Sequence, residues 1–413
     1  MLTLSAAALA VALALAPPQG DTLRLAEAQR TARAANPMLR AERLAALAAR
    51  ERIAPAGALT DPQFEFGLEN RMLKGFGTED PMTMNTFRLS QMMPWPGKRT
   101  AARDGATALA EADSLGALEQ EAMLSARVAM AYLEAALADR VLGVMGETLR
   151  LLRGFQETAV GMYTVGQGIQ QDVLQAQVAV ARMAADTVAM SGERAAAAAR
   201  LNALLARAPD SLVPALEYPA VGDTLPIMDS LAAQAYRARP ALAAAQARIT
   251  AADRAIDAAR RESYPDVMFG AAYQARPRYD DMMSLMFGVN LPIWGGAKQA
   301  PMRREREAMR AMEDARLQDL RNETWAQLAA LRARANRAVQ LDRIYAQEIL
   351  PQARAAVEAA QSAYRVGRAD FMTLVESQMT VNRYQTERHR LAADYHGARA
   401  EIEALLGGPG ALP

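Results

Sequence analysis

The chain carries the same series of sequence landmarks twice, about 200 residues apart. A Tyr-x-Val-Gly motif occurs at 163–166 and again at 364–367. Upstream of each motif lie two segments of alternating apolar and polar residues, followed by Trp95 in the first copy and Trp294 in the second. The 413 residues are therefore predicted to form one supersecondary unit and its duplicate, rather than two or three unrelated domains.

The boundary between the two copies is marked by proline. The segment 208–226 contains Pro209, Pro214, Pro219 and Pro226, a density typical of a connecting loop. The predicted organisation is a signal peptide at 1–20, a first repeat at 21–207, the connector at 208–226, a second repeat at 227–406 and a tail at 407–413.

Each copy contains two short segments whose period of two predicts β-strands with one apolar face. The predicted strands cover about 62–70, 83–93, 266–274 and 283–291. Such strands suit an outer-membrane barrel, although two half-buried hairpins of a soluble sheet would give the same pattern. Trp95 and Trp294 favour the membrane, because they follow the second strand of each pair, where an aromatic belt would lie at the membrane interface. Four strands cannot close a barrel, so this interpretation requires several chains to share one, most simply about twelve strands from three chains.

The rest of each copy is predicted to be helical. Ala, Leu, Met, Glu, Gln and Arg dominate it, and no proline occurs between Gly97 and Met162, enough for a helix of roughly 95 Å. Apolar residues there step by three or four, as in a coiled coil. Glycine-containing turns at 163–168 and 364–368 lead into a second long helix in each copy. Pro351 predicts a bend or an opened hydrogen-bond ladder in the second copy. The predicted fold class is mainly α with a small β part.

Charge and composition exclude several classes of function. Lys and Arg nearly balance Asp and Glu, for a formal net charge of +1 without a basic block, so nucleic acid is not an expected partner. There is no cysteine, and the only histidines, His389 and His396, are too far apart on one helix to share a metal. We expect neither an enzyme nor a cofactor-binding protein.

The amino terminus indicates export. Residues 2–16 are almost entirely Leu, Ala and Val and precede Pro17, which is typical of a secretory signal, with an apolar helix as the alternative. Without cysteine, no lipid anchor is expected.

Taken together, the signal, the duplicated strand pair with a long helical hairpin, and the two tip motifs resemble the TolC-like outer-membrane efflux proteins. The local matches include Asn36 to Leu39, Met93 to Arg99 and both Tyr-x-Val-Gly tips. The segment from Arg276 to Trp294 looks most like the heavy-metal efflux branch of this family.

This resemblance implies a homotrimer in the outer membrane, in contact with outer-membrane lipid, whose twelve-stranded barrel continues into a periplasmic helical tunnel. It also implies an inner-membrane pump and a periplasmic adaptor, which the tips would contact through Val165, Gly166, Gln167, Val366, Gly367 and Arg368. The positions that match the periplasmic gate are Thr373 and Glu376 for its acidic rings, and Asp172 and Tyr364 for a latch between the hairpins. Thr373 departs from the family pattern, because one of the two acids is absent.

Several alternatives stay open from the sequence. The chain could be a soluble periplasmic coiled-coil scaffold, or the outlet of a type I protein secretion system. Glu376 could be an ordinary solvated residue on a helix face. The clustered methionines, at 82–93 and 282–286, could bind Cu(I) or Ag(I), or only fill apolar surfaces.

Overall fold

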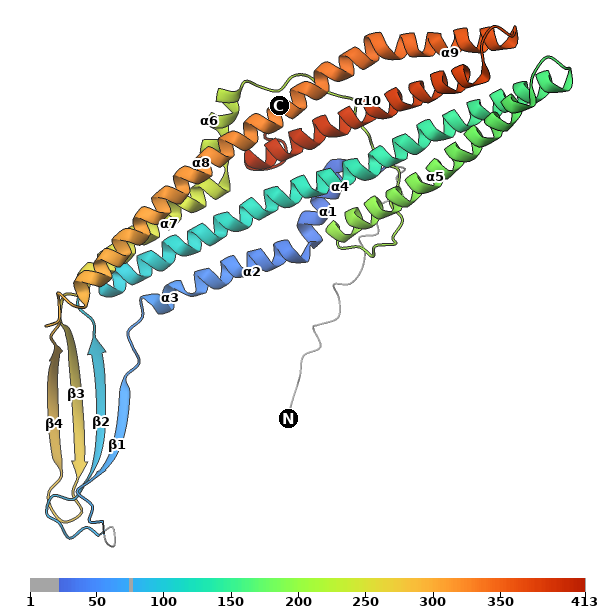
Figure 1. The fold of residues 1–413 in the computed structure, drawn as a ribbon. Coiled ribbons are helices and arrows are strands. Elements are labelled where there is room, and N and C mark those ends of the chain that lie inside the picture. The colour runs from blue at the N-terminus through green and yellow to red at the C-terminus, as the bar shows by residue number, and fades with distance from the viewer. Residues whose placement is uncertain (1–21, 74–76, 413) are drawn as a thin grey trace. The chain divides into compact units, whose positions relative to one another are not determined.

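The computed structural model of the protein describes residues 22–73 and 77–412. The predicted signal peptide lies outside these residues. The described chain is mainly helical, with one small antiparallel sheet (Figure 1), which confirms the predicted fold class.

The elements follow one another in the predicted order. They are α1 (Leu25–Ala35), α2 (Pro37–Glu51), α3 (Ile53–Ala56), β1 (Gln63–Glu69), β2 (Met84–Met93), α4 (Lys98–Thr164), α5 (Gln170–Leu204), α6 (Met228–Ala238), α7 (Pro240–Arg261), β3 (Asp266–Ala275), β4 (Met282–Asn290), α8 (Gln299–Ile344), the π-helical turn η1 (Tyr345–Ile349), α9 (Leu350–Arg365) and α10 (Phe371–Leu405).

Contacts divide the chain into two compact units, and each unit takes segments from both sequence repeats. The described part of the hairpin unit is 22–36, 124–226 and 330–402. The strand unit comprises the described residues of 37–123, 227–329 and 403–412. Each sequence repeat therefore contributes to both compact units. The predicted division of the chain into two repeats stays a prediction.

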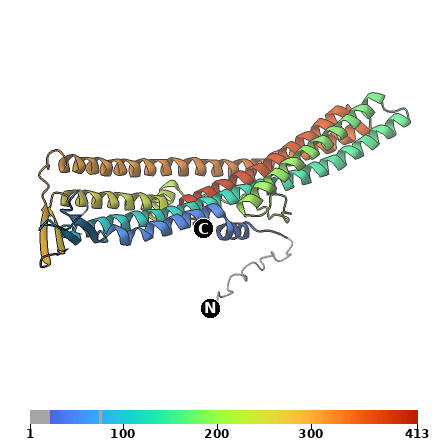
Figure 2. The same ribbon diagram turned by 90° about the horizontal axis from the view of Figure 1, so that it is seen from below.

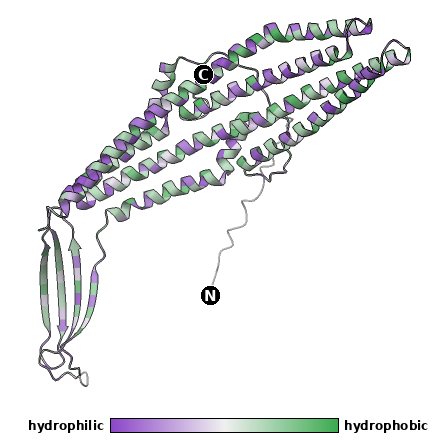
Figure 3. Cartoon of the chain, in the orientation of Figure 1, coloured by the Kyte–Doolittle hydropathy of each residue, from purple (hydrophilic) through white to green (hydrophobic). Residues whose placement is uncertain are grey.

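The sheet of the strand unit has the order β1-β2-β3-β4, with every neighbouring pair antiparallel. Its register brings aromatic residues together on one face: Phe66 lies opposite Phe87, and Phe87 lies opposite Tyr273. The centroids of the Phe66 and Phe87 rings are 5.1 Å apart. Hydrophobic and hydrophilic residues alternate along the strands (Figure 3), as the period of two predicts.

The passage from sheet to helix in the strand unit is fixed by the Trp95-Pro-Gly97-Lys98 sequence. Gly97 has a φ of 90°, a conformation that disfavours other residues, and α4 begins directly after it. The buried ammonium of Lys98 lies 2.9 Å from a carboxylate oxygen of Asp266 at the start of β3. Asp266 also accepts a hydrogen bond from the Trp95 backbone N–H at 2.8 Å. One carboxylate thus ties the end of β2 and the start of α4 to β3.

A buried charge network joins the helices of the strand unit. Arg239, between α6 and α7, donates to the Glu119 carboxylate of α4 at 3.0 Å and to the Thr324 hydroxyl of α8 at 2.6 Å. Glu119 also accepts from the Ala241 backbone N–H. Removing one partner from a buried pair costs roughly 3 to 5 kcal/mol, because the other charge stays buried. These polar contacts therefore hold α4, α8 and the junction between α6 and α7 together.

The hairpin unit is built from the ends of the two long helical hairpins, α4 with α5 and α9 with α10, which lie side by side near their turns (Figures 1 and 2). Their facing sides share one core. Its buried members are Leu152, Phe155, Ala159, Ala176, Met183, Ala360, Tyr364, Phe371, Leu374 and Val375.

The second hairpin is interrupted where Pro351 predicts it. The π-helical turn η1 separates α8 from α9, and Pro351 is in the first turn of α9. Proline has no N–H, so the ladder opens on its N-terminal side and the wider π turn absorbs the irregularity. Among the described residues, no helix is both long and apolar enough to span a lipid bilayer.

Candidate functional site

The two tips of the hairpin unit have the same backbone. After α4, Gly166 has a φ of 74°, its N–H donates to the Tyr163 carbonyl, and the Gln167 N–H donates to the Met162 carbonyl. After α9, Gly367 has a φ of 67°, and the N–H groups of Gly367 and Arg368 donate to the carbonyls of Tyr364 and Ala363. Both turns are Schellman motifs, in which glycine supplies the left-handed residue that ends a helix.

Tyr364 at the second tip connects the two hairpins. Its side chain is 3% exposed, packs edge-on against Phe371 at 5.4 Å, and donates from its hydroxyl to the Asp172 carboxylate of α5 at 3.2 Å. Burial, and next the nearby Asp172 carboxylate, raises the pKa of Tyr364 to about 12. The phenol therefore stays protonated at physiological pH and remains a donor to Asp172. The two residues predicted as a latch are in contact, while their role in gating stays a prediction.

Tyr163 at the first tip has a different environment, although its motif is the same. Its side chain is 47% exposed. The residue that corresponds to Asp172 in the second copy is Thr373, which is exposed on α10. Within one chain, only one of the two tip tyrosines is thus bonded across to the other hairpin, among the residues that the structure describes.

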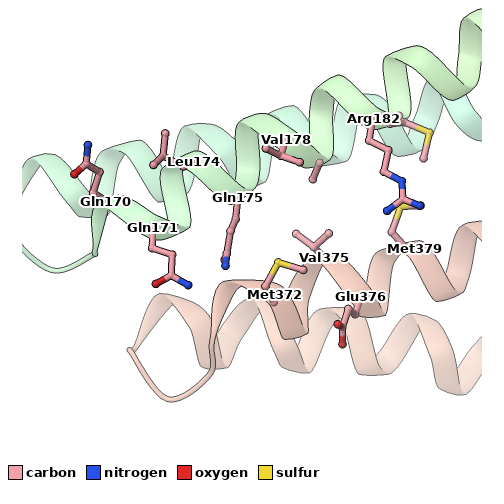
Figure 4. A pocket seen from close by; sticks show the side chains of 12 residues that line it. Gln170, Gln171, Leu174, Gln175, Val178, Arg182, Met372, Val375, Glu376 and Met379 are labelled. Carbon is pink, nitrogen blue, oxygen red and sulfur yellow. The ribbon is translucent and has the colours of Figure 1, made fainter.

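A groove of about 950 Å³ lies between α5 and α10 behind the tips (Figure 4). Its apolar lining includes Leu174, Val178, Val375 and Met379, and its charged residues are Arg182 and Glu376. Glu376 is exposed and follows Thr373 by one turn of α10. Glu376 therefore lines this groove, and Thr373 lies one turn before it on the same helix.

The residues predicted to contact an adaptor lie at the ends of the hairpins. Val165 and Val366 are 68% and 67% exposed, although both are apolar. Gly166, Gln167, Gly367 and Arg368 are exposed beside them. The role of these six residues in contacting an adaptor stays a prediction.

The strand unit exposes an apolar surface of its own, which we name the apolar face. Within the described residues of the strand unit, no helix covers it (Figure 1). Every second residue of all four strands belongs to it, and the opposite face carries polar residues such as Glu65, Arg88 and Ser284. The exposed members of the apolar face are Phe64, Phe66, Leu68, Phe87, Leu89, Met93, Phe269, Tyr273, Met283, Leu285, Phe287 and Val289.

The two tryptophans predicted for the membrane interface lie next to this sheet. Trp95 follows β2 and stacks on Tyr264, with ring centroids 5.4 Å apart and an interplanar angle of 10°. Trp294 follows β4 and is 70% exposed. Their role at a membrane interface stays a prediction.

Some features of these sites have no local sequence signal. The groove combines one face of α5 with one face of α10, and the Arg239 network joins three distant segments. Neither a motif nor a period marks such residues. In the described part of the chain, no group of three His, Cys, Asp or Glu side chains is arranged to hold a metal ion.

Comparison with known proteins now gives this geometry a context. Residues 231–408 match the family model of the outer membrane efflux proteins. The pyoverdine export outer membrane protein OpmQ of Pseudomonas putida is 24% identical over 402 residues, which cover 88% of this chain and 83% of OpmQ.

Several solved structures have a similar fold over nearly the whole length of this chain. The outer-membrane channel OprN has a TM-score of 0.81 at 19% identity, covering 94% of this chain and 91% of its own. CusC, which forms a transmembrane channel, has a TM-score of 0.81 at 17% identity, covering 93% of this chain and 92% of CusC. VceC of Vibrio cholerae, an outer membrane protein, has a TM-score of 0.78 at 19% identity, with 93% and 96% covered.

These proteins are described as outer-membrane channels, outer-membrane proteins and an export protein, which agrees with the prediction that the chain is not an enzyme. They do not single out the heavy-metal branch. The second repeat of this chain matches the outer membrane efflux protein family, and the chain as a whole has the TolC-like fold of outer-membrane efflux channels.

Proposed function

We propose that the chain is the outer-membrane exit duct of a tripartite efflux system, through which a pump in the inner membrane and a periplasmic adaptor pass their substrates to the exterior. The apolar face carries this proposal. A sheet that exposes twelve large apolar side chains on one face would aggregate in water, whereas lipid would cover this face without cost.

The edges of the sheet support a homotrimer. In the described sheet, β1 and β4 each have only one neighbouring strand. Unpaired backbone groups cannot face lipid, so the sheet must close on other copies. Three copies supply twelve strands, which is within the range of membrane barrels.

The helical part then extends into the periplasm, with the exposed tips toward the adaptor. On this proposal, the bond between Tyr364 and Asp172 holds the two hairpins of each subunit together in the resting duct. Three copies of Glu376 would line the narrow end and favour cations over anions.

The proposal is tested on outer membranes extracted with detergent. We expect a trimer that migrates as one species until it is boiled and that forms channels in planar bilayers. A protein that stays in the soluble periplasmic fraction as a monomer would instead support the coiled-coil scaffold.

The adaptor contact is tested separately, because the chain contains no cysteine. The Val165→Cys and Val366→Cys variants carry one thiol each. In cells, a thiol-reactive crosslinker should join each of these thiols to a periplasmic adaptor protein. Glu147→Cys is the matched control, because Glu147 is exposed on α4 at a distance from the tip, and this variant should give no crosslinked adaptor.

A soft metal cargo is a second candidate, because methionines occupy the polar face of the sheet. Met92 lies opposite Met268, the Met268 methyl lies over Gly288, and the Met286 methyl lies over Gly270. Three adjacent thioethers suit Cu(I) or Ag(I). Replacing all three by Leu should abolish Ag(I) binding by the purified trimer, whereas Met283→Leu on the apolar face should not. Equal Ag(I) binding by both variants would rule out these three methionines as a metal site, and the proposal of an exit duct would be unaffected.

A further inference from the structure

A pocket of about 400 Å³ in the hairpin unit is separate from the groove and from the tips. It lies where the connector between the two repeats runs against α4, α10 and the helix around η1. Its polar lining consists of Arg140, Asp342, Arg354, Gln385, Arg388 and His389, and its remaining lining of Tyr218, Pro219, Ala220, Val221, Leu350 and Ala392.

The charges in this pocket do not balance. Three guanidinium groups face one carboxylate, and Asp342 is already bonded to Arg388, with 2.8 Å between its Oδ1 and the Arg388 Nε. In the described structure, neither Arg140 nor Arg354 forms an ion pair. The nearby Asp394 carboxylate is held by Arg334 at 2.6 Å. Two positive charges in the pocket are therefore left without compensation.

The walls of the pocket are held in place. The Arg140 guanidinium lies over the Tyr218 ring, 5.9 Å from its centroid, and this ring meets the His389 ring edge-on at 6.0 Å. The Tyr218 hydroxyl donates to the His389 backbone carbonyl. Burial, and next the Arg140 and Arg388 charges, lower the pKa of His389. The Arg140 and Arg388 guanidinium groups thus disfavour a further positive charge on this imidazole.

The π turn brings the two sides of the pocket into line. At about 100° per residue, the twelve residues from Asp342 to Arg354 would turn Arg354 roughly 120° away in an uninterrupted α-helix. The π turn at Tyr345–Ile349 takes up one extra residue and reduces this angle to roughly 20°. Asp342, Leu350 and Arg354 consequently face one cavity. Single π turns inside α-helices frequently occur at functional sites.

We propose that this pocket binds a small organic anion, whose carboxylate or phosphate group lies between Arg140 and Arg354 and whose apolar part lies against Val221 and Leu350. Guanidinium groups form strong, paired hydrogen bonds with both kinds of oxyanion. The volume is suited to a small ligand. A ligand here would link the connector to both hairpins, because each contributes one wall.

Isothermal titration of the intact detergent-solubilised protein tests this site, with succinate and inorganic phosphate as the two probes and succinamide as the uncharged control. We expect saturable binding of at least one anion and none of succinamide. Arg354→Ala and Arg140→Ala should each weaken it about tenfold or more, and Arg354→Lys by less. Arg150→Ala, exposed on the same helix as Arg140, should leave it unchanged.

Saturable binding of succinate alone assigns a carboxylate ligand, and of phosphate alone a phosphate ligand. If neither succinate nor phosphate bound, the proposed site would be wrong. Equal anion binding by the Arg354→Ala and Arg150→Ala variants would also overturn it. Channel conductance of the same variants is measured in parallel and should not change, so that failure of this site is distinguishable from failure of the exit duct.

Discussion

The two hairpin tips have the same motif and the same turn, yet they end in different environments. Tyr163 is about half exposed, whereas Tyr364 is buried and bonded to Asp172 of the other hairpin. The difference arises beyond the turn: the residues after it are Gln170 and Asp172 in the first copy and Phe371 and Thr373 in the second. Duplication has preserved the backbone, while the neighbouring side chains decide which tip joins the hairpins.

The largest expected difference between the tips concerns the residues that begin the returning helices. Phe371 is completely buried in the shared core, and Gln170 at the equivalent place is exposed. Phe371→Ala should destabilise the hairpin unit by about 3 to 5 kcal/mol, because it leaves a cavity. Gln170→Ala should change the free energy of unfolding by less than about 0.5 kcal/mol. Chemical denaturation measures both, and similar values would show that the tips share one kind of packing.

The tyrosines give the next largest difference. Tyr364→Phe removes the donor to Asp172 but keeps the ring, and should cost about 1 to 2 kcal/mol. Tyr163→Phe should cost nothing measurable. Urea unfolding of the two variants compares them directly. If Tyr163→Phe were as costly as Tyr364→Phe, the first tip would have a hydroxyl partner of equal value, such as Thr373 of a neighbouring subunit.

The glycines should show no difference, which makes them the control for the comparison. Gly166→Ala and Gly367→Ala both force a side chain into the left-handed region, and each should cost roughly 1 kcal/mol. No heavy atom within 4 Å would meet the added methyl group at either position. Unequal losses in thermal stability would mean that the turns differ in backbone strain, contrary to their matching hydrogen bonds.

The smallest expected effect is a dependence on pH that only the second hairpin has. Both histidines are on α10, and burial lowers the pKa of His389 and of His396 below the ordinary value of 6.5. The unfolded chain therefore takes up protons first as the pH falls, so stability is lost below about pH 6.5. The melting temperature should fall between pH 7 and pH 5, and less so in the His389→Asn, His396→Asn double variant. An equal fall in both proteins would assign the acid sensitivity to other groups.

The fold was accessible from the sequence where the signal is local. Alternation along the strands, glycine after each tip tyrosine and Pro351 in the second hairpin all correspond to structural features at those positions. These signals depend on neighbours within a few residues, which a sequence displays directly.

The remaining features depend on distant segments. The two tip motifs do not themselves indicate which tyrosine is buried, because the Asp172 carboxylate that accepts from Tyr364 belongs to the other hairpin. Likewise, the partners of Arg239 lie on α4 and α8, and Arg140 and Arg354 meet only through the fold and the π turn. The compact units combine segments of both repeats for the same reason. The two hairpins pack against each other side by side, and the spacing of a sequence repeat contains no information on such contacts.

The central claim, that the apolar face meets lipid in the outer membrane, is tested most directly by site-specific labelling of the cysteine-free chain. Leu285→Cys and Ser284→Cys place a thiol on the apolar face and on the polar face, one residue apart. In outer membranes, a fluorophore at 285 should be quenched by lipid-borne quenchers and a fluorophore at 284 by aqueous iodide. Equal quenching of both positions by iodide, without an effect of the lipid quencher, would contradict the claim.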